Sequence, residues 1–206
     1  MNKSSQPIDL LVRRFDRHYQ AAIGYYERSD YEAACREFEE CIELIESGQV
    51  FSDESIPVNQ YAVMADFRSM VYSGHGDTLN YGIGDLAGAT VSYRRALEFQ
   101  PGEKMLTFQY VEALYEQCRF NEGLGAIEDR LRLAPSDLDA LLMMALLYWE
   151  CGEGARALKY AFDCISYCET WDYTLGVCIR DPAYYASARA LIEEILIMDG
   201  ELPLTN

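Results

Sequence analysis

Among the residues whose types could do chemistry, the first pair to consider is Cys164 and Cys168. Because they are four residues apart, the two thiols would share one face of a helix. A zinc site would need further ligands at matching spacing, and the two histidines of the chain, His18 and His75, stand far away in the sequence. We therefore predict that both cysteines are buried, because a free thiol packs as a small apolar group.

His75 lies in the segment SGHGD, two residues before Asp77. A catalytic Cys–His or His–Asp pair would need neighbours in space that the sequence does not place. Two histidines in 206 residues also argue against general acid–base catalysis. The carboxylates are spread along helix faces, as in CREFEECIELIE, which is typical of solvated surfaces. The sequence therefore predicts no catalytic residue, no metal site, no cofactor and no enzymatic activity.

Residues 82–88, GIGDLAG, have the glycine spacing of a dinucleotide-binding motif. That motif binds phosphate only where a strand enters a helix. The residues before it show no strand pattern, so we expect a turn between two helices here.

The chain is strongly acidic, with a formal net charge of -17. Such a surface repels nucleic acids and anionic lipids, whereas solubility or a basic protein partner would explain it. Arg13, Arg14 and Arg17 stand where a signal peptide would need an apolar core. The longest apolar run, LDALLMMALLYW, is too short to cross a bilayer. Seven cysteines, mostly inside helical patterns, fit a reducing compartment. We expect a cytoplasmic protein that binds no nucleic acid and does not insert into membranes.

A pattern of small and aromatic residues recurs along the chain and defines the elements that would position any site. The segment GDLAGATVSYRRALEFQP, residues 84–101, returns after 34 residues as 118–135 and after another 34 as 152–169. An earlier copy, residues 29–46, begins 55 residues before the copy at 84–101. This offset equals one period of 34 residues plus an insertion of about 21 residues. A fixed period of this length indicates stacked helical repeats.

Each quoted segment is expected to be the second helix of a hairpin, with a small residue where two helices cross. These crossing residues are Ala34, Ala89, Gly123 and Ala157. One turn later, larger groups fill the gap between neighbouring helices, namely Phe38, Tyr93 and Ile127. Capping boxes predict helix starts at Ser29 with Glu32 and at Ser136 with Asp139. Asp181 and Pro182 precede a last helix, expected over about 183–199.

The best copy resembles the tetratricopeptide repeat (TPR) family through Ala89, Tyr93, Ala96 and Pro101. The third copy departs from the family pattern at Arg130, where a small residue is usual. The resemblance implies an all-α fold, a right-handed superhelix of about four TPR-like helix hairpins with a concave groove and a C-terminal capping helix.

The second copy carries Asn80 where the other copies have Tyr25, Leu114 and Tyr148. The register of its first helix is therefore open by about one residue. Four glycines, Gly74, Gly76, Gly82 and Gly84, are expected to loosen this part of the chain.

The expected organisation is an N-terminal extension over 1–14, repeats within 15–169, and a connector with the capping helix over 170–206. The repeats are placed at about 15–47, 70–103, 104–137 and 138–169, with an insertion over 48–69. Pro57 is expected to start a helix within the insertion, residues 1–7 to be disordered, and residues 170–181 to be an irregular connector.

Under the repeat alignment, one face of the first helices carries aromatic and aliphatic residues at helical spacing. We predict that they line a groove for an extended, apolar peptide. The alternative is that they pack inside the superhelix and against the terminal helix. The predicted groove residues are Tyr19, Ile23, Tyr26, Tyr81, Phe108, Tyr115, Leu142, Leu146 and Trp149.

These features predict a non-catalytic chaperone or adaptor that binds an apolar segment of a partner protein. In size, acidity and apolar groove the chain resembles small acidic bacterial secretion chaperones of the TPR type. The alternatives are an acidic inhibitor or immunity protein that blocks a basic surface, and a scaffold whose groove its own C-terminal helix fills. A homodimer through Leu10, Leu11 and Phe15 is also compatible with the sequence.

Overall fold

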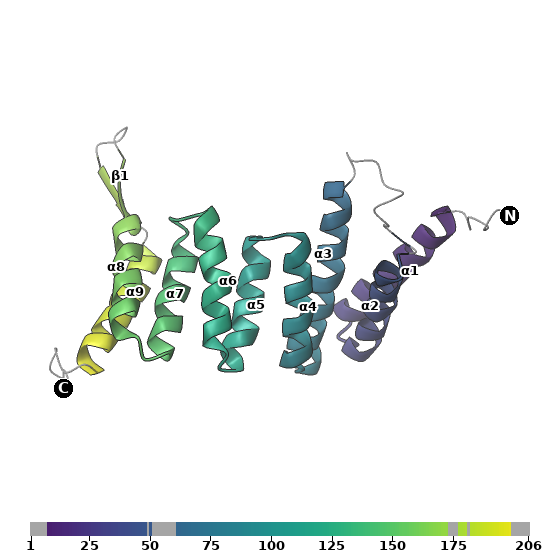
Figure 1. The fold of residues 1–206 in the computed structure, drawn as a ribbon, viewed down its shortest axis with the longest axis horizontal. Helices are drawn as coiled ribbons and strands as arrows, with labels where there is room; N and C mark the ends of the chain where they lie inside the picture. The colour runs from purple at the N-terminus through teal and green to yellow at the C-terminus, as the bar shows by residue number, and fades with distance from the viewer. Residues whose placement is uncertain (1–7, 49, 51–60, 173–176, 181, 199–206) are drawn as a thin grey trace. The chain divides into compact units, whose positions relative to one another are not determined.

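The computed structural model describes residues 8–48, 50, 61–172, 177–180 and 182–198. The predictions for residues 1–7 and for Pro57 therefore lie outside the described residues. The chain divides into two compact units, residues 1–117 and 118–206. Each unit is a row of helices in which neighbours along the chain pack together (Figure 1). The predicted all-α helical repeat fold is confirmed.

The first unit contains five α-helices and one π-helical segment among its described residues. In chain order they are α1 (Ile8–Glu27), α2 (Tyr31–Glu46), α3 (Tyr61–Asp77), η3 (Thr78–Ile83), α4 (Leu86–Phe99) and α5 (Lys104–Glu116). Each α-helix packs against the next one. Helix α1 begins inside the predicted extension, so residues 8–14 belong to the first helix.

The second unit contains α6 (Phe120–Leu133), α7 (Leu138–Glu150), α8 (Gly154–Cys168), β1 (Glu169–Asp172), β2 (Val177–Arg180) and α9 (Pro182–Met198). Strands β1 and β2 form an antiparallel hairpin with Trp171 opposite Cys178. The expectation of an irregular connector was therefore wrong where the structure describes it. Helix α9 packs against α8 and α7, and it begins at Pro182 because proline suits the first turn of a helix.

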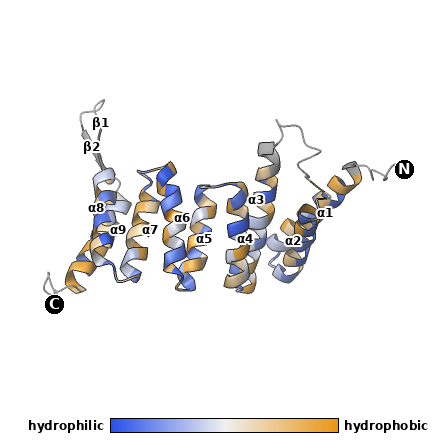
Figure 2. Cartoon of the chain, viewed as in Figure 1, coloured by the Kyte–Doolittle hydropathy of each residue, from blue (hydrophilic) through white to orange (hydrophobic). Residues whose placement is uncertain are grey.

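The small residues predicted at helix crossings are all buried, as the repeat pattern requires. Ala34, Ala89 and Ala157 are fully buried, and Gly123 is buried as well. The larger residues one turn later, Phe38, Tyr93 and Ile127, are among the most deeply buried side chains of the described residues. Hydrophobic and hydrophilic residues mix along the helices (Figure 2), because each helix buries only one side.

Two predicted helix starts are displaced by one residue. Asp30, not Ser29, caps α2 by accepting a hydrogen bond from the Ala33 backbone N–H. Likewise Asp137, not Ser136, caps α7. Asp137 also accepts two hydrogen bonds from Arg130, at 2.9 and 2.7 Å. This partly buried ion pair explains how the third repeat accommodates an arginine where the TPR pattern has a small residue.

The glycines of α3 mark close packing, and the expectation that they loosen the chain was wrong. A Cβ atom on Gly74 would lie 2.6 Å from Cζ of Phe38, and one on Gly76 would lie 2.6 Å from Cε1 of Tyr93. Both aromatic rings are buried. Glycine is therefore needed here because α3 approaches the aromatic residues of α2 and α4 more closely than any side chain allows.

The π-helical segment η3 resolves the uncertain register of the second repeat. A π-helical turn accommodates one extra residue within a helix. As a result Leu79, and not Asn80, is buried in the way that Leu114 and Tyr148 are buried in later repeats. The segment ends at Ile83, Gly84 follows it with a left-handed φ of 82°, and Asp85 then caps α4. The predicted interhelical turn is thus present in GIGDLAG, where Gly84 and Asp85 join η3 to α4.

Candidate functional site

Six of the predicted groove residues lie in the first unit, and all six keep part of their surface exposed; four of them are described first. Tyr26 comes from α1, Tyr81 from η3, and Phe108 and Tyr115 from α5. Tyr81 is the most accessible of them, with 54% of its surface exposed. The aliphatic stem of Lys104 brings its ammonium to 5.9 Å from the centre of the Phe108 ring. These side chains are available for contact with a ligand.

Tyr19 and Ile23 have a different environment from the rest of the predicted groove. Both pack against the buried cluster between α1 and α2. The Tyr19 ring stacks on Phe15 and meets Phe38 edge to face, with ring centres 6.2 and 6.3 Å apart. Each of these two residues thus contacts the core on one side and keeps part of its surface exposed.

Asp77, which ends α3, lies near two groove tyrosines of the first unit, Tyr26 and Tyr81. Its Oδ1 accepts hydrogen bonds from the Tyr93 hydroxyl and from Nε2 of Gln109, both at 2.8 Å. The Tyr81 hydroxyl donates to Glu112 at 2.9 Å. We call this group the tyrosine–carboxylate cluster, and it consists of Tyr26, Asp77, Tyr81, Tyr93, Gln109 and Glu112.

Burial and charge perturb the acidity of the tyrosine–carboxylate cluster. Burial raises the pKa of the Asp77 carboxyl, and the hydrogen bonds from Tyr93 and Gln109 oppose that rise. Burial raises the pKa of Tyr81 to about 12, assisted by the hydrogen bond to Glu112 and by the charge of Asp77. Burial and the same charge raise the pKa of Tyr26. The carboxylate of Asp77 is therefore held at a cost to folding, a feature that often marks functional sites.

Asp77→Asn should increase the free energy of unfolding at neutral pH, because asparagine keeps an oxygen that accepts both hydrogen bonds and removes a partly buried charge. When folding raises the pKa of a carboxyl, the folded protein loses stability as the pH rises through that raised value. The advantage of the variant should therefore shrink as the pH is lowered towards the ordinary value of 3.8. Urea unfolding at several pH values measures this, and an advantage independent of pH would contradict the assignment.

The remaining groove residues, Leu142, Leu146 and Trp149, lie on α7 in the second unit and are partly exposed. Leu142 packs against a buried cluster that includes Cys164, Cys168 and Ala188 of α9. One predicted groove residue, Leu142, thus packs against the same buried cluster as the terminal helix. The burial of Cys164 and Cys168 agrees with the prediction that they are core thiols.

A pocket that the sequence did not indicate lies in the second unit. It has a volume of about 360 Å³ and is lined by Glu128, Leu131, Arg132, Pro135, Leu141, Met144 and Tyr160. These residues come from α6, α7 and α8 and from the loop after α6, so their convergence depends on packing between helices.

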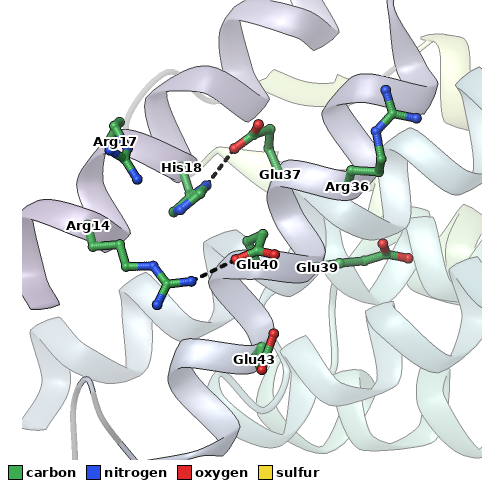
Figure 3. Close-up of a pocket in the computed structure, with 8 residues that line it drawn as sticks. All are labelled: Arg14, Arg17, His18, Arg36, Glu37, Glu39, Glu40 and Glu43. Carbon is green, nitrogen blue, oxygen red and sulfur yellow. Dashed lines mark hydrogen bonds and ion pairs between the residues drawn. The ribbon is translucent and has the colours of Figure 1, made fainter.

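A charged cleft of about 790 Å³ lies between α1 and α2 (Figure 3). Arg14 pairs with Glu40 at 2.9 Å, and Nδ1 of His18 lies 2.6 Å from Glu37. The other residues that line it are Arg17, Arg36, Glu39 and Glu43. The cleft carries charges of both signs that pair with one another, so it offers no single sign of charge to a ligand.

His75 meets partners that the sequence did not place. Its Nε2 lies 3.3 Å from Sγ of Cys35, and its Nδ1 lies 2.9 Å from Oγ of Ser92. Burial lowers the pKa of His75, and burial with the nearby Glu39 raises the pKa of the Cys35 thiol to about 11. Because a raised pKa disfavours the thiolate, the pair is poorly suited to nucleophilic catalysis.

The comparisons with known proteins agree with the architecture. Helices whose small residues are buried at crossings, packed in sequence order, define a TPR-like fold. Solved structures with this fold resemble the chain. One is MamA from Desulfovibrio magneticus RS-1, from its residue 41 to its end, with a TM-score of 0.55 and 14% identity over 91% of this chain and 96% of that chain. A double mutant of MamA has the same TM-score and identity over 92% of this chain and 98% of that chain.

A further similar structure is that of YrrB, described as a TPR protein with an unusual peptide-binding site. Its TM-score is 0.54, with 17% identity over 77% of this chain and 70% of that chain. No protein-family profile and no curated protein sequence matches the chain. At such identities, the likeness concerns the fold. Among the described residues, none of the helices has the length and apolar character needed to span a membrane.

Proposed function

We propose that this protein is a non-catalytic, peptide-binding TPR-like protein that holds a segment of a partner protein on the inner face of its first helices. The observation that carries the proposal is the exposed Tyr81, which lies near the partly exposed Tyr26 and donates a hydrogen bond to Glu112. Tyrosine supplies a large contact area with few rotatable bonds, so it is common at binding surfaces.

The tyrosine–carboxylate cluster indicates that the bound segment has polar groups as well as apolar side chains. Ionised carboxylates only accept hydrogen bonds, and each can accept about four. Asp77 and Glu112, beside Tyr26 and Tyr81, therefore suit a segment that presents N–H donors or a basic side chain among apolar residues. The net charge of -17 favours such a partner through long-range attraction.

The finer proposal is that the protein acts as a chaperone or adaptor. A groove that covers an exposed apolar segment prevents that segment from pairing with other chains before it reaches its destination. The fold likeness to YrrB, whose structure is described as having a peptide-binding site, supports this by analogy.

Tyr81→Ala should weaken binding of a selected peptide by about tenfold or more, since truncating an aromatic residue at the centre of an interface, where such residues carry most of the binding energy, costs about 2 kcal/mol. The peptide would be selected from a library of extended sequences displayed against the full chain. Phe162→Ala is the matched control, because Phe162 on α8 is 55% exposed, almost the same fraction as Tyr81. Equal losses for both variants in a titration would contradict the proposed groove.

The net charge of -17 also favours a second candidate, an inhibitor that covers a basic surface of its partner. Charge-driven association weakens steeply as salt is added, whereas burial of apolar side chains does not. Measuring the affinity of the selected peptide, and later of the natural partner, across ionic strengths separates the two candidates.

A further inference from the structure

A group of three metal-ligating side chains joins α2 to α3. Cys35 and Glu39 are four residues apart on α2 and so share a helix face. His75 reaches them from α3, 40 residues away from Cys35 along the chain. One ligand atom from each residue lies within 4.8 Å of the others. Among the residues that the structure describes, no other three His, Cys, Asp or Glu side chains come together in this way.

The distances between these atoms suit one tetrahedral ion. Zinc binds cysteine sulfur at about 2.3 Å and histidine nitrogen at about 2.0–2.1 Å, which at tetrahedral angles separates the two ligand atoms by about 3.5 Å. Sγ of Cys35 lies 3.3 Å from Nε2 of His75 and 3.8 Å from Oε1 of Glu39. Both separations lie close to that expected edge, so small movements of the side chains would bring the ligands into place.

The histidine is held in the orientation that a metal ligand needs. Nδ1 of His75 lies 2.9 Å from Oγ of Ser92 on α4. When Nδ1–H donates to that hydroxyl, Nε2 presents its lone pair towards Cys35 and Glu39. A hydrogen bond from the second ring nitrogen is the usual way in which proteins fix a ligating histidine. Ser92 is itself buried, which keeps the hydroxyl in position.

The group also has a route to solvent. Cys35 is buried, with 8% of its surface exposed, but Glu39 is exposed, and its carboxylate points away from Arg14 and His18 (Figure 3). Through Glu39 the group is therefore accessible to solvent.

We propose that Cys35, Glu39 and His75 bind one zinc ion, with solvent in the fourth position. A thiolate and an imidazole favour zinc over magnesium or calcium, which prefer oxygen ligands. On binding, the proton of the Cys35 thiol leaves to solvent and a zinc–sulfur bond forms, so no oxidant or reductant is involved. The ion would link α2 to α3, and thereby the first repeat to the second. This role is independent of the proposed peptide groove.

Cobalt(II) substitution tests the site directly on the full chain. We expect one equivalent of cobalt to produce the thiolate-to-cobalt charge-transfer absorption and the strong visible bands of a tetrahedral ion, and zinc to displace both. Cys35→Ser should abolish the charge-transfer band, whereas Cys118→Ser, which alters an exposed cysteine, should leave it unchanged. A band that survives in Cys35→Ser, or none in the native chain, would overturn the proposal.

Because Cys35 is buried, Cys35→Ser could fail to bind metal simply by failing to fold, so variants of exposed glutamates provide a second test. Glu39→Gln should weaken cobalt and zinc binding by about tenfold or more, while Glu43→Gln, with the same change of charge on the same exposed helix face, should not. Added zinc should also raise the thermal midpoint of the native chain and of Glu43→Gln, because a ligand that binds only the folded state stabilises it. Equal zinc affinities for the two glutamine variants would contradict a role for Glu39.

Discussion

Phe38→Ala is expected to lower the free energy of unfolding by about 3–5 kcal/mol, the range for removing a buried aromatic ring. Phe38 on α2 is 1% exposed. It contacts the Tyr19 ring edge to face, and its ring fills the space left by Gly74 on α3. Because the residue opposite on α3 is a glycine, that side of the resulting cavity has no side chain to fill it, so the loss should fall in the upper part of the range. Chemical denaturation measures it.

A double-mutant cycle with Gly74 makes this prediction specific to the contact. In the native background Gly74→Ala should be destabilising, since its Cβ would lie 2.6 Å from Cζ of Phe38. In the Phe38→Ala background the same substitution should be stabilising, because the methyl group enters the cavity and alanine favours a helix over glycine by about 0.5–1 kcal/mol. An effect of the same sign in both backgrounds would show that the two residues do not share this space.

Gly76→Ala is the second substitution for which we expect a large effect, a loss of about 1–3 kcal/mol from overpacking. The new Cβ would lie 2.6 and 2.7 Å from two atoms of the Tyr93 ring. Tyr93 is fully buried and its hydroxyl is fixed by Asp77 at 2.8 Å, so the ring has little freedom to move aside. The helix-forming advantage of alanine, at most about 1 kcal/mol, is too small to reverse the sign.

Gly125→Ala is the matched control for this prediction. Gly125 lies within α6, and a Cβ there would meet nothing within 4 Å. The substitution should therefore stabilise the protein by about 0.5–1 kcal/mol through helix propensity alone. Thermal and urea unfolding of the two variants should shift in opposite directions, and a stabilised Gly76→Ala would contradict the close packing of α3 on α4.

The repeated fold could be predicted because its determinants are local and periodic. A small residue followed one turn later by a large one, as in Ala89 and Tyr93, is visible in any copy of the repeat. Stacking requires the same residues to face inwards each time, so their burial follows from their spacing. The helix caps were predicted one residue too early, at Ser29 and Ser136, because aspartates next to them satisfy the same backbone groups.

The groove was predicted only as a set of positions on first helices. Their equivalence in the repeats placed Tyr26, Tyr81 and Tyr115 together in the alignment. The sequence missed Asp77 and Gln109 as parts of the same cluster, because neither stands at an equivalent position. It did not show that Tyr19 also packs against Phe38, because the periodicity of Tyr19 is the same whether it faces a ligand or the core.

By itself, the sequence determined the TPR-like repeats, the acidic surface and the small residues at the crossings, since each depends on composition or on spacing along one helix. Only the tertiary structure decided that Gly74 and Gly76 receive aromatic rings, that a π-helical turn sets the register at Leu79, and that His75 meets Cys35. These contacts join residues that packing brings together from different helices. Local periodicity records which face of a helix is buried, but it does not record which residues of the neighbouring helix that face will meet.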